Sequence, residues 1–462
     1  MGDMDIKYYI TIKNSEIIHL VKTKDVKIMD MCLANLDVDI SQNGNEYEII
    51  WSSQKFLYMS VEFVSLLFEN TVLPILSFVQ EQVKVDFFVS NVGYELISNI
   101  GDYVFDFRQE LSKFNDFVIL IFKSSAYKAY FTKDVKIYSK SQPPSLSKIQ
   151  HCLYEYSRLY GSLDKEERLN IFFVEEFPFD GISWSGNIVI KENNVRNYFI
   201  IFHELAHQWF NWLMNPSPYW LIEAMADFSS NYILNQHYNL KMSTLLKKQR
   251  ENYAAWLIYH EDIDLVDCNM VRSSFEREAI CHGKSAFFLV NLERELGKEF
   301  FCLVQHWLKG TPFWQCCKAF LKESYENFVK QWGKARKQFE VLKVVKKQGK
   351  VIVIGLDKMI YPLCISVILK NGEQGCLRLR REIYNEIPLD DYTVDVKEIL
   401  LINFDKRFYI NGYLTLAKYM IGNGELSLSR RIIKNGLQRY PDEPVLVQIL
   451  MDLNNSNRCN IN

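Results

Sequence analysis

Residues 202–210, FHELAHQWF, place two histidines and a glutamate in a stretch that otherwise has the apolar pattern of a buried helix. His203 and His207 are four residues apart, so both imidazoles project from one face of a helix and can converge on one cation. The apolar run before them supports a helix, and Pro216 and Pro218 break the chain shortly after it. Any fold for this chain must therefore contain a helix that ends before these prolines and presents both imidazoles on one side.

The side chains of this helix match the requirements of a catalytic zinc ion. Zinc bound by two neutral imidazoles needs a third protein ligand and keeps a fourth position for water, whose pKa the metal lowers toward about 7. Glu204 directly follows His203 and can accept the proton of that water. The alternative is a chance grouping on a polar helix face, but an unpaired polar cluster is costly on a helix this apolar.

A second helix after the prolines can supply the third ligand. Residues 219–234, YWLIEAMADFSSNYIL, are amphipathic, with Glu223 in the opening turns and Asp227 one turn later. The sequence predicts that His203, His207 and Glu223 bind one zinc ion. Asp227 is a weaker ligand candidate and a better candidate for holding a ligand in place. The histidines predicted not to be ligands are His151, His237, His260 and His306.

The rest of the chain predicts an α+β protein of several domains. With 462 residues, two to four modules are expected. Short β-rich runs precede a polar, proline-containing stretch at 139–148, helical periodicity follows, and strand-like alternation returns after 342. The predicted domains are a β-sheet domain at 1–140, a helical catalytic domain with an edge sheet at 141–342, a β-sandwich at 343–408 and a helical segment at 409–462.

The C-terminal segment 416–450 predicts a helical hairpin. Its two amphipathic helices are joined by a glycine-rich turn and stopped by Pro441, so they resemble one tetratricopeptide-like hairpin. Such repeats need at least about three units to stand alone, so a cap packed on its neighbours is favoured over a peptide-binding array. In the preceding strands, Asn371 and Gly372 predict a tight hairpin turn.

Composition excludes several other functions. Lys plus Arg (54) nearly balances Asp plus Glu (56), so the totals imply neither a nucleic-acid partner nor an anionic membrane surface. The chain start lacks the basic and apolar regions of a secretory signal, and the apolar stretches are interrupted or too short to span a bilayer. Ten scattered cysteines without a CxxC pair suggest neither a disulfide framework nor a thiolate zinc site. We therefore expect a cytoplasmic protein, of an oligomeric state that the sequence does not predict.

The phrases HELAHQWF and YWLIEAMADF together resemble the gluzincin zinc metallopeptidases of the aminopeptidase N type, whose third ligand is a Glu within W-L-x-E-x-x-A. Fifteen residues separate His207 from Glu223, against eighteen in the family, and the difference falls in the loop between the helices. The resemblance implies a thermolysin-like catalytic domain, a peptide substrate and Glu204 as general base. It spans almost the whole chain, although the terminal helical part is much shorter than in large members.

The chain departs from this family where the substrate amine would bind. Family members carry G-x-M-E-N, and its Glu binds the free α-amine, whereas residues 177–190 read FPFDGISWSGNIVI. Gly181 is retained, but Ser183 or Trp184, depending on the register, stands in place of the glutamate. The candidate acidic substitutes are Asp180, Glu175 and Glu176. For all three the alternative is a solvated loop or strand end, which carries no ligand.

A second departure concerns the tyrosine that donates a hydrogen bond to the oxyanion in the family. Alignment of Lys284 with the family lysine puts His282 at the tyrosine position, and no tyrosine lies between Tyr259 and Tyr325. An imidazole N–H at His282 can donate in its place, though it is shorter than a phenol. His282 and Lys284 are therefore candidate catalytic residues beside Glu204, and a structural role is the alternative for both.

Three hypotheses remain open from the sequence. The first is an active zinc peptidase with a divergent pocket, which processes a dedicated peptide at its N-terminus or internally. The second is a zinc hydrolase of a non-peptide amide or ester. The third is a catalytically silent, zinc-bearing scaffold that binds a peptide. Glu204 favours hydrolysis, because a structural zinc ion needs no general base.

Overall fold

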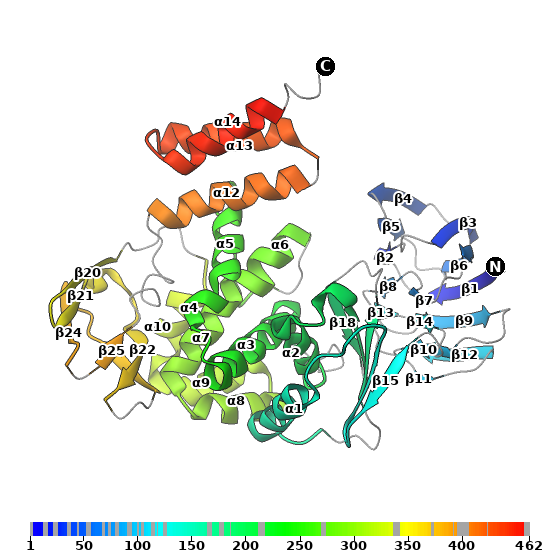
Figure 1. The fold of residues 1–462 in the computed structure, drawn as a ribbon, viewed down its shortest axis with the longest axis horizontal. Coiled ribbons are helices and arrows are strands. Elements are labelled where there is room, and N and C mark those ends of the chain that lie inside the picture. The colour runs from blue at the N-terminus through cyan, green and yellow to red at the C-terminus, as the bar shows by residue number, and fades with distance from the viewer. Residues whose placement is uncertain are drawn as a thin grey trace. The chain divides into compact units, whose positions relative to one another are not determined.

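The computed structural model is α+β. It describes strands within residues 3–122 and eleven further ranges, in which most residues are described with their side chains. These are 127–163, 169–174, 180–184, 186–210, 218–268, 274–335, 342–370, 374–390, 392–394, 406–422 and 424–456. The chain forms two compact units, one of residues 1–158 and 162–215 and the other of residues 159–161 and 216–462. Figure 1 shows the fold and labels most of the helices and strands.

The strands within 3–122 form three antiparallel sheets, with the orders β12-β9-β1-β6-β3, β11-β10-β14-β7 and β13-β8-β2-β5-β4. Central strand β1 pairs with β6 and β9, for example Tyr8 with Val61 and Phe87. Their bounds are β1 (Asp3–Ile12), β2 (Ile17–Val21), β3 (Val26–Ala34), β4 (Val38–Asn43), β5 (Glu46–Trp51), β6 (Leu57–Leu66), β7 (Asn70–Val72), β8 (Ile75–Phe78), β9 (Val83–Val89), β10 (Glu95–Ser98), β11 (Gly101–Asp102), β12 (Asp106–Leu111), β13 (Asp116–Phe117) and β14 (Ile119–Phe122).

A five-stranded mixed sheet lies in the same unit. Its order is β15 (Lys128–Phe131), β16 (Val135–Ser139), β17 (Leu169–Val174), β19 (Asn187–Lys191) and β18 (Gly181–Trp184). The three central strands are parallel and the two edges antiparallel. The central strands are apolar and largely buried, as parallel strands usually are. Strands β15 and β16 precede residue 140, so this sheet includes residues that the sequence assigns to the N-terminal domain.

Two helices accompany this sheet. Helix α1 (Leu146–Tyr160) connects β16 to β17, and α2 (Tyr198–Ala206) follows the short 3-10 turn η2 (Glu192–Asn194) after β19. The hydroxyl of Tyr156 on α1 donates a hydrogen bond of 3.1 Å to the carbonyl oxygen of Phe202 on α2. Because Ile201, Phe202, Leu205 and Ala206 of α2 are fully buried, the backbone that carries the histidine pair is fixed by packing.

The second unit begins with a helical region. Helix α3 starts after Pro218 and ends at Tyr238, and the next residue, Asn239, has a φ of 55°, the left-handed conformation that often closes a helix. A π-helical segment, η3, joins α6 to α7. The bounds are α3 (Tyr219–Tyr238), α4 (Met242–Leu245), α5 (Lys247–Trp256), α6 (Ser274–Ala279), η3 (Ile280–Lys284), α7 (Ser285–Leu296), α8 (Glu299–Leu308), α9 (Phe313–Leu321), η4 (Lys322–Ser324) and α10 (Tyr325–Trp332).

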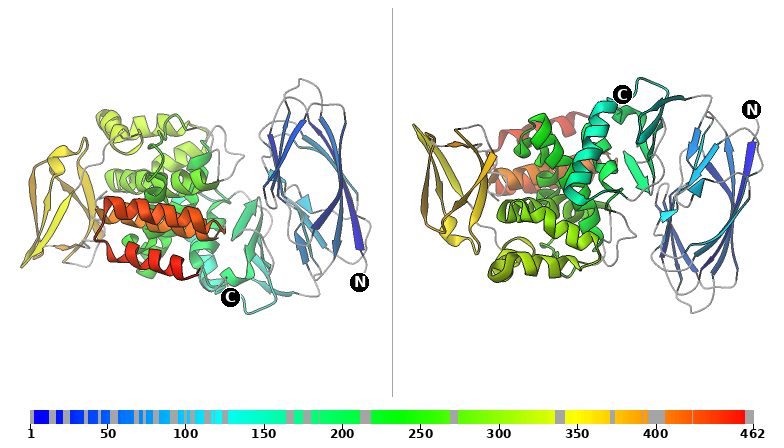
Figure 2. Two further views of the ribbon diagram at one scale, coloured as in Figure 1. Left: turned by 90° about the horizontal axis from the view of Figure 1, so that it is seen from above. Right: turned by 90° about the horizontal axis from the view of Figure 1, so that it is seen from below.

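Two three-stranded antiparallel sheets follow, with the orders β20-β21-β24 and β23-β22-β25 (Figure 2). The bounds are β20 (Lys343–Lys347), β21 (Lys350–Ile354), η5 (Leu356–Lys358), β22 (Leu363–Leu369), β23 (Gln374–Leu379), β24 (Tyr384–Pro388) and β25 (Tyr392–Val394). Strands β22 and β23 pair as a hairpin, while the predicted turn at Asn371 and Gly372 lies outside the described residues. The β-sandwich over 343–408 stays a prediction.

Three helices close the described chain, α12 (Lys406–Gly422), α13 (Leu426–Arg439) and α14 (Pro444–Ser456). The predicted two-helix hairpin is incomplete, because a third helix, α14, follows it. Helix α14 begins at Pro444, and proline is compatible with the first position of a helix. The three helices lie side by side (Figure 2). Buried side chains of α12 and α13, among them Tyr413 and Ile433, share an apolar core with Ala255 of α5. This packing supports the cap expected from the sequence.

Among helices of the described residues, none combines the length and the apolar character that crossing a membrane requires.

Candidate metal and catalytic site

A first group of candidate residues lies at the C-terminal turn of α2. The Nε2 atoms of His203 and His207 are 3.1 Å apart, and their ring planes differ by 82°. Two nitrogens at the usual zinc distance and a tetrahedral angle are about 3.3 Å apart, so this spacing fits one shared zinc ion. Nδ1 of His207 lies 2.9 Å from the carbonyl oxygen of Phe210. A proton on Nδ1 would therefore leave Nε2 as the nitrogen with a lone pair for a metal.

Glu204 lies between the histidines and is buried, with 5% of its surface exposed. A Cβ atom added to Gly181, at the start of β18, would lie 2.5 Å from Oε1 and 2.7 Å from Cγ of Glu204. Only glycine therefore leaves room for this glutamate side chain. The carboxylate of Glu204 is thus held between its own helix and the edge strand.

Gln208 also ties β18 to the end of α2. Its amide nitrogen donates a hydrogen bond of 2.6 Å to Oγ of Ser183, and its Oε1 accepts one of 3.0 Å from the backbone N–H of Gly186. Ser183 therefore faces α2, on the same side of the strand as Gly181. Trp184 ends β18, and its side chain is outside the part of the chain that the structure describes.

The acidic candidates for binding an amine are placed differently. Asp180 is exposed, and its Oδ1 accepts a hydrogen bond of 3.0 Å from the side-chain amide of Asn194. Its backbone carbonyl accepts one of 3.1 Å from the N–H of Lys191. Glu175 and Glu176 lie outside the described residues. The carboxylate of Asp180 is therefore solvated and engaged with the turn after β19.

A second group of candidate residues belongs to the other unit, where α3 faces the π-helical segment η3. Glu223 and Asp227 are one turn apart on α3, and His282 approaches both of them. Nδ1 of His282 is 2.9 Å from Oδ2 of Asp227, and Nε2 is 3.8 Å from Oε2 of Glu223. The imidazole therefore hydrogen-bonds to Asp227 and lies near Glu223 without a direct hydrogen bond to it.

The carboxylates near His282 outweigh the effect of burial on its pKa. Burial alone lowers the pKa of His282, but the nearby carboxylate of Asp227, its hydrogen bond and the charge of Glu223 together raise that pKa above its ordinary value. Burial raises the pKa of the neighbouring Cys281 thiol well above its usual range, and Glu223 adds to this rise. Cys281 is therefore a neutral thiol, which makes it a poor nucleophile.

Lys284 is buried and fully engaged. Its ammonium donates hydrogen bonds to Oδ2 of Asp262 (2.8 Å), to the carbonyl oxygen of Ile263 (2.5 Å) and to that of Lys334 (2.9 Å). Only 4% of its surface is exposed. An ammonium has three protons to donate, so this arrangement favours a structural role.

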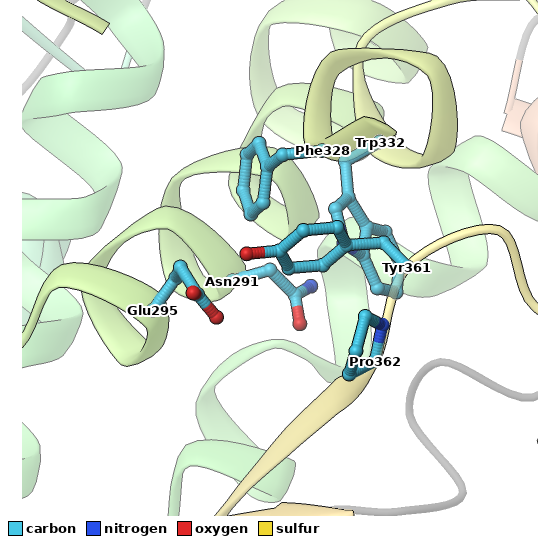
Figure 3. A pocket seen from close by; sticks show the side chains of 6 residues that line it. All are labelled: Asn291, Glu295, Phe328, Trp332, Tyr361 and Pro362. Atoms are coloured by element: carbon cyan, nitrogen blue, oxygen red, sulfur yellow. The ribbon is translucent and has the colours of Figure 1, made fainter. Parts of the chain in front are cut away.

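A pocket in the same unit lies between α7, α10 and the segment before β22 (Figure 3). It is lined by Asn291, Glu295, Phe328, Trp332, Tyr361 and Pro362. Arg378 of β23 pairs with Glu295 at 3.2 Å and donates a hydrogen bond of 3.1 Å to the hydroxyl of Tyr361. Burial and the Glu295 hydrogen bond raise the pKa of Tyr361 to about 12. Tyr361 is therefore neutral and serves the internal packing of this unit.

Two contacts go beyond what the sequence predicts. The sequence predicts Asp227 only as a ligand or a support for the metal, whereas the structure pairs it with His282, 55 residues away. Gln208 joins Ser183 to α2, and the one sequence feature that points to this contact is the polar side chain directly after His207. Of the histidines not expected to be ligands, His260 stacks on Trp256 at 3.9 Å.

Comparison with known proteins gives matches only among solved structures. No family model and no curated protein matches this chain. An M1 zinc metallopeptidase variant from Deinococcus radiodurans bound to a Tyr-Ser-Ala substrate is 12% identical, with a TM-score of 0.44 and coverage of 73% of this chain and 91% of that chain. A two-domain M1 zinc metallopeptidase variant bound to L-tryptophan is also 12% identical, with a TM-score of 0.44 and coverage of 72% and 90%.

Native leukotriene A4 hydrolase from Saccharomyces cerevisiae is 12% identical, with a TM-score of 0.41 and coverage of 69% of this chain and 62% of that chain. These likenesses are distant in sequence and in structure. The assignment of the site therefore rests on the residues of this chain.

Proposed function

We propose that this chain is a zinc-dependent peptidase in which His203, His207 and Glu223 bind one zinc ion and Glu204 is the general base. The observation that carries the proposal is the 3.1 Å spacing of the two Nε2 atoms on α2, because it fits two ligands of one tetrahedral metal. The donor set of two imidazoles and one carboxylate is typical of catalytic zinc. When bound there, zinc would supply a Lewis acid and lower the pKa of a coordinated water.

Glu204 has the position and the surroundings of a general base. It follows His203 directly, and Gly181 lets its carboxylate pack against the edge strand. A carboxylate held in this way can accept the proton of the attacking water and pass it to the leaving amine. His282 would donate its imidazole N–H to the oxyanion in place of the family tyrosine.

The substrate in this proposal is a peptide that lies along β18. An edge strand can pair with an extended peptide through backbone hydrogen bonds. Ser183 and Trp184 stand where the family carries its amine-binding glutamate, and the carboxylate of Asp180 is engaged with Asn194. A free α-amine is therefore bound less strictly than in the family, and this arrangement accommodates both terminal and internal cleavage. We assign Lys284 a structural role.

The proposal is tested by metal analysis followed by peptide digestion. Purified protein is analysed for zinc and then incubated with a peptide pool in which half of the peptides carry acetylated N-termini. Products are identified by mass spectrometry for wild type, Glu204→Gln and the control Glu299→Gln, which changes an exposed glutamate on α8.

We expect one zinc ion per chain in all three proteins and products from wild type and Glu299→Gln only. Loss of the general base should slow hydrolysis on the order of 10²- to 10⁴-fold. Absence of metal binding, or equal products from Glu204→Gln, would overturn the proposal. Zinc without peptide products would favour the scaffold or the non-peptide hydrolase, and cleavage of acetylated peptides would indicate weak recognition of the amine.

A further inference from the structure

Helix α3 carries a line of polar side chains that continues beyond the proposed zinc ligand. Glu223, Asp227 and Asn231 are spaced at four residues, so they lie along one face of the helix. Asp227 is 2% exposed and Asn231 is fully buried. A buried carboxylate is costly unless a charged or hydrogen-bonding partner compensates for its lost hydration. Asp227 must therefore be explained by its contacts.

The contact that explains Asp227 is its hydrogen bond with His282. Oδ2 of Asp227 lies 2.9 Å from Nδ1 of the imidazole, and only 17% of the His282 side chain is exposed. Nδ1 carries a proton in the imidazolium and in one neutral tautomer, so either form can donate to the carboxylate. The ring therefore has a fixed orientation in which Nδ1 faces Asp227 and Nε2 faces the side of Glu223.

The local backbone is adapted to this contact. His282 is in the π-helical segment η3, and such segments occur frequently at functional sites. The close packing of η3 against α5 supports the same segment, because a Cβ on Gly283 would lie 3.0 Å from Cβ of Tyr253. The hydroxyl of Ser285 donates to the carbonyl oxygen of Cys281, which satisfies a backbone group in the distorted turn. The irregular turn is thus stabilised on both sides of His282.

We propose that Asp227 is a positioning residue that acts through His282 and not through the metal. Asp227 holds the imidazole so that Nε2, which also carries a proton in the imidazolium form, can donate to the substrate carbonyl oxygen during hydrolysis. The alternative is that Asp227 supports a zinc ligand, as the sequence suggested. The inference rests on the proposed peptidase function for its catalytic consequence, whereas the orientation of the ring rests on the contact alone.

The experiment separates ring orientation, metal binding and catalysis. Proton NMR of protein with ¹⁵N-labelled histidine detects the hydrogen-bonded Nδ1–H of His282, which is assigned by its absence in His282→Asn. Zinc affinity is measured by competition with a chelator, and kcat and KM with the best-cleaved peptide of the pool. The variants are Asp227→Asn, His282→Asn and their double substitution, with Asp357→Asn as the exposed control.

We expect a hydrogen-bonded Nδ1–H signal in wild type that shifts or disappears in Asp227→Asn, and unchanged zinc affinity. The kcat of Asp227→Asn should fall about 10- to 100-fold at constant KM, the usual loss for a supporting contact. The double variant should be no slower than His282→Asn, because both residues act as a unit. Asp357→Asn should behave as wild type throughout.

A 10- to 100-fold loss of zinc affinity in Asp227→Asn would overturn the inference in favour of a metal-supporting role. Additive losses in the double variant, or no His282-dependent signal in wild type, would also contradict it. The wild-type spectrum and His282→Asn decide the orientation even if Asp227→Asn does not fold. If no peptide is cleaved, the proposed function fails, while the spectra and the zinc affinities still test the role of Asp227.

Discussion

Gly181 illustrates how a single missing side chain can position a catalytic group. A methyl group at this residue would lie 2.5 Å from Oε1 of Glu204, which is closer than atoms can approach. In Gly181→Ala the carboxylate must therefore move, and overpacking of this kind usually costs about 1 to 3 kcal/mol. We expect lower thermal stability and a loss of hydrolysis close to that of Glu204→Gln, with zinc retained. Calorimetry, zinc analysis and the peptide pool measure the three effects.

The matched control is Gly422→Ala at the C-terminal end of α12, where an added Cβ has nothing within 4 Å. This substitution should leave stability within about 1 kcal/mol of wild type. Wild-type activity and stability in Gly181→Ala would show that β18 or Glu204 can shift without cost, and that Gly181 does not restrict this site.

Residue by residue, the sequence predicts best those features that depend on short spacing. The pair of imidazoles on α2 follows from four-residue spacing on an apolar helix, and the structure places their Nε2 atoms 3.1 Å apart. Asp227 and His282 were each named as candidates, but their contact joins two helical segments whose packing no local pattern encodes. The same holds for Gln208 and Ser183, which join a helix to a strand.

At the scale of the element, α7 contains a carboxylate whose titration affects the stability of the fold. Burial raises the pKa of Glu293 to about 7, and the adjacent Arg294 only partly offsets this. Because the folded state holds this proton more tightly than the unfolded chain, its contribution to stability is greatest below about pH 4.5 and declines as the pH rises to about 7.

We therefore expect Glu293→Gln to be more stable than wild type at pH 8, by about 1 to 3 kcal/mol, and the difference to vanish near pH 4.5. Denaturant unfolding of both proteins at the two pH values measures this. Glu299→Gln on neighbouring α8, where the side chain is exposed, should show no such pH-dependent gain. A gain of equal size at both pH values would mean that the packing of the Glu293 side chain, and not its ionisation, lowers the free energy of unfolding of wild type.

Helices and strands were predictable from the sequence where the residue pattern of a single segment defines them. The helical periodicity after the stretch 139–148 and the proline break before α3 predicted helices that the structure contains, α1 and α3. The sequence did not reveal that β16, before residue 140, pairs in parallel with β17, because that pairing depends on residues 30 or more positions apart. Helix α14 was missed because Pro441 and Pro444 indicate a helix end as well as a helix start.

On the scale of the whole molecule, Lys284 links segments that are far apart in sequence. Its ammonium joins η3 to residues 262–263 and to Lys334, just beyond the end of α10. Asp262 is itself tied to α5, because it accepts a hydrogen bond of 2.6 Å from the hydroxyl of Tyr253. One buried cation thus connects four parts of the helical region, which accounts for a lysine at this position without a catalytic role.

Substitution Lys284→Met should consequently act on stability and not on chemistry. It keeps much of the side-chain volume but leaves the carboxylate of Asp262, whose side chain is 1% exposed, without its cation. Breaking a buried ion pair in this way costs about 3 to 5 kcal/mol.

Lys350→Met is the matched control, because Lys350 pairs with Glu386 at 2.7 Å on the surface, where solvent screens the charges. The loss of this pair should not measurably change the free energy of unfolding. Denaturant unfolding of both variants, with kcat measured on the fraction that remains folded, decides between the roles. Normal stability combined with lost turnover in Lys284→Met would instead give this lysine a catalytic role.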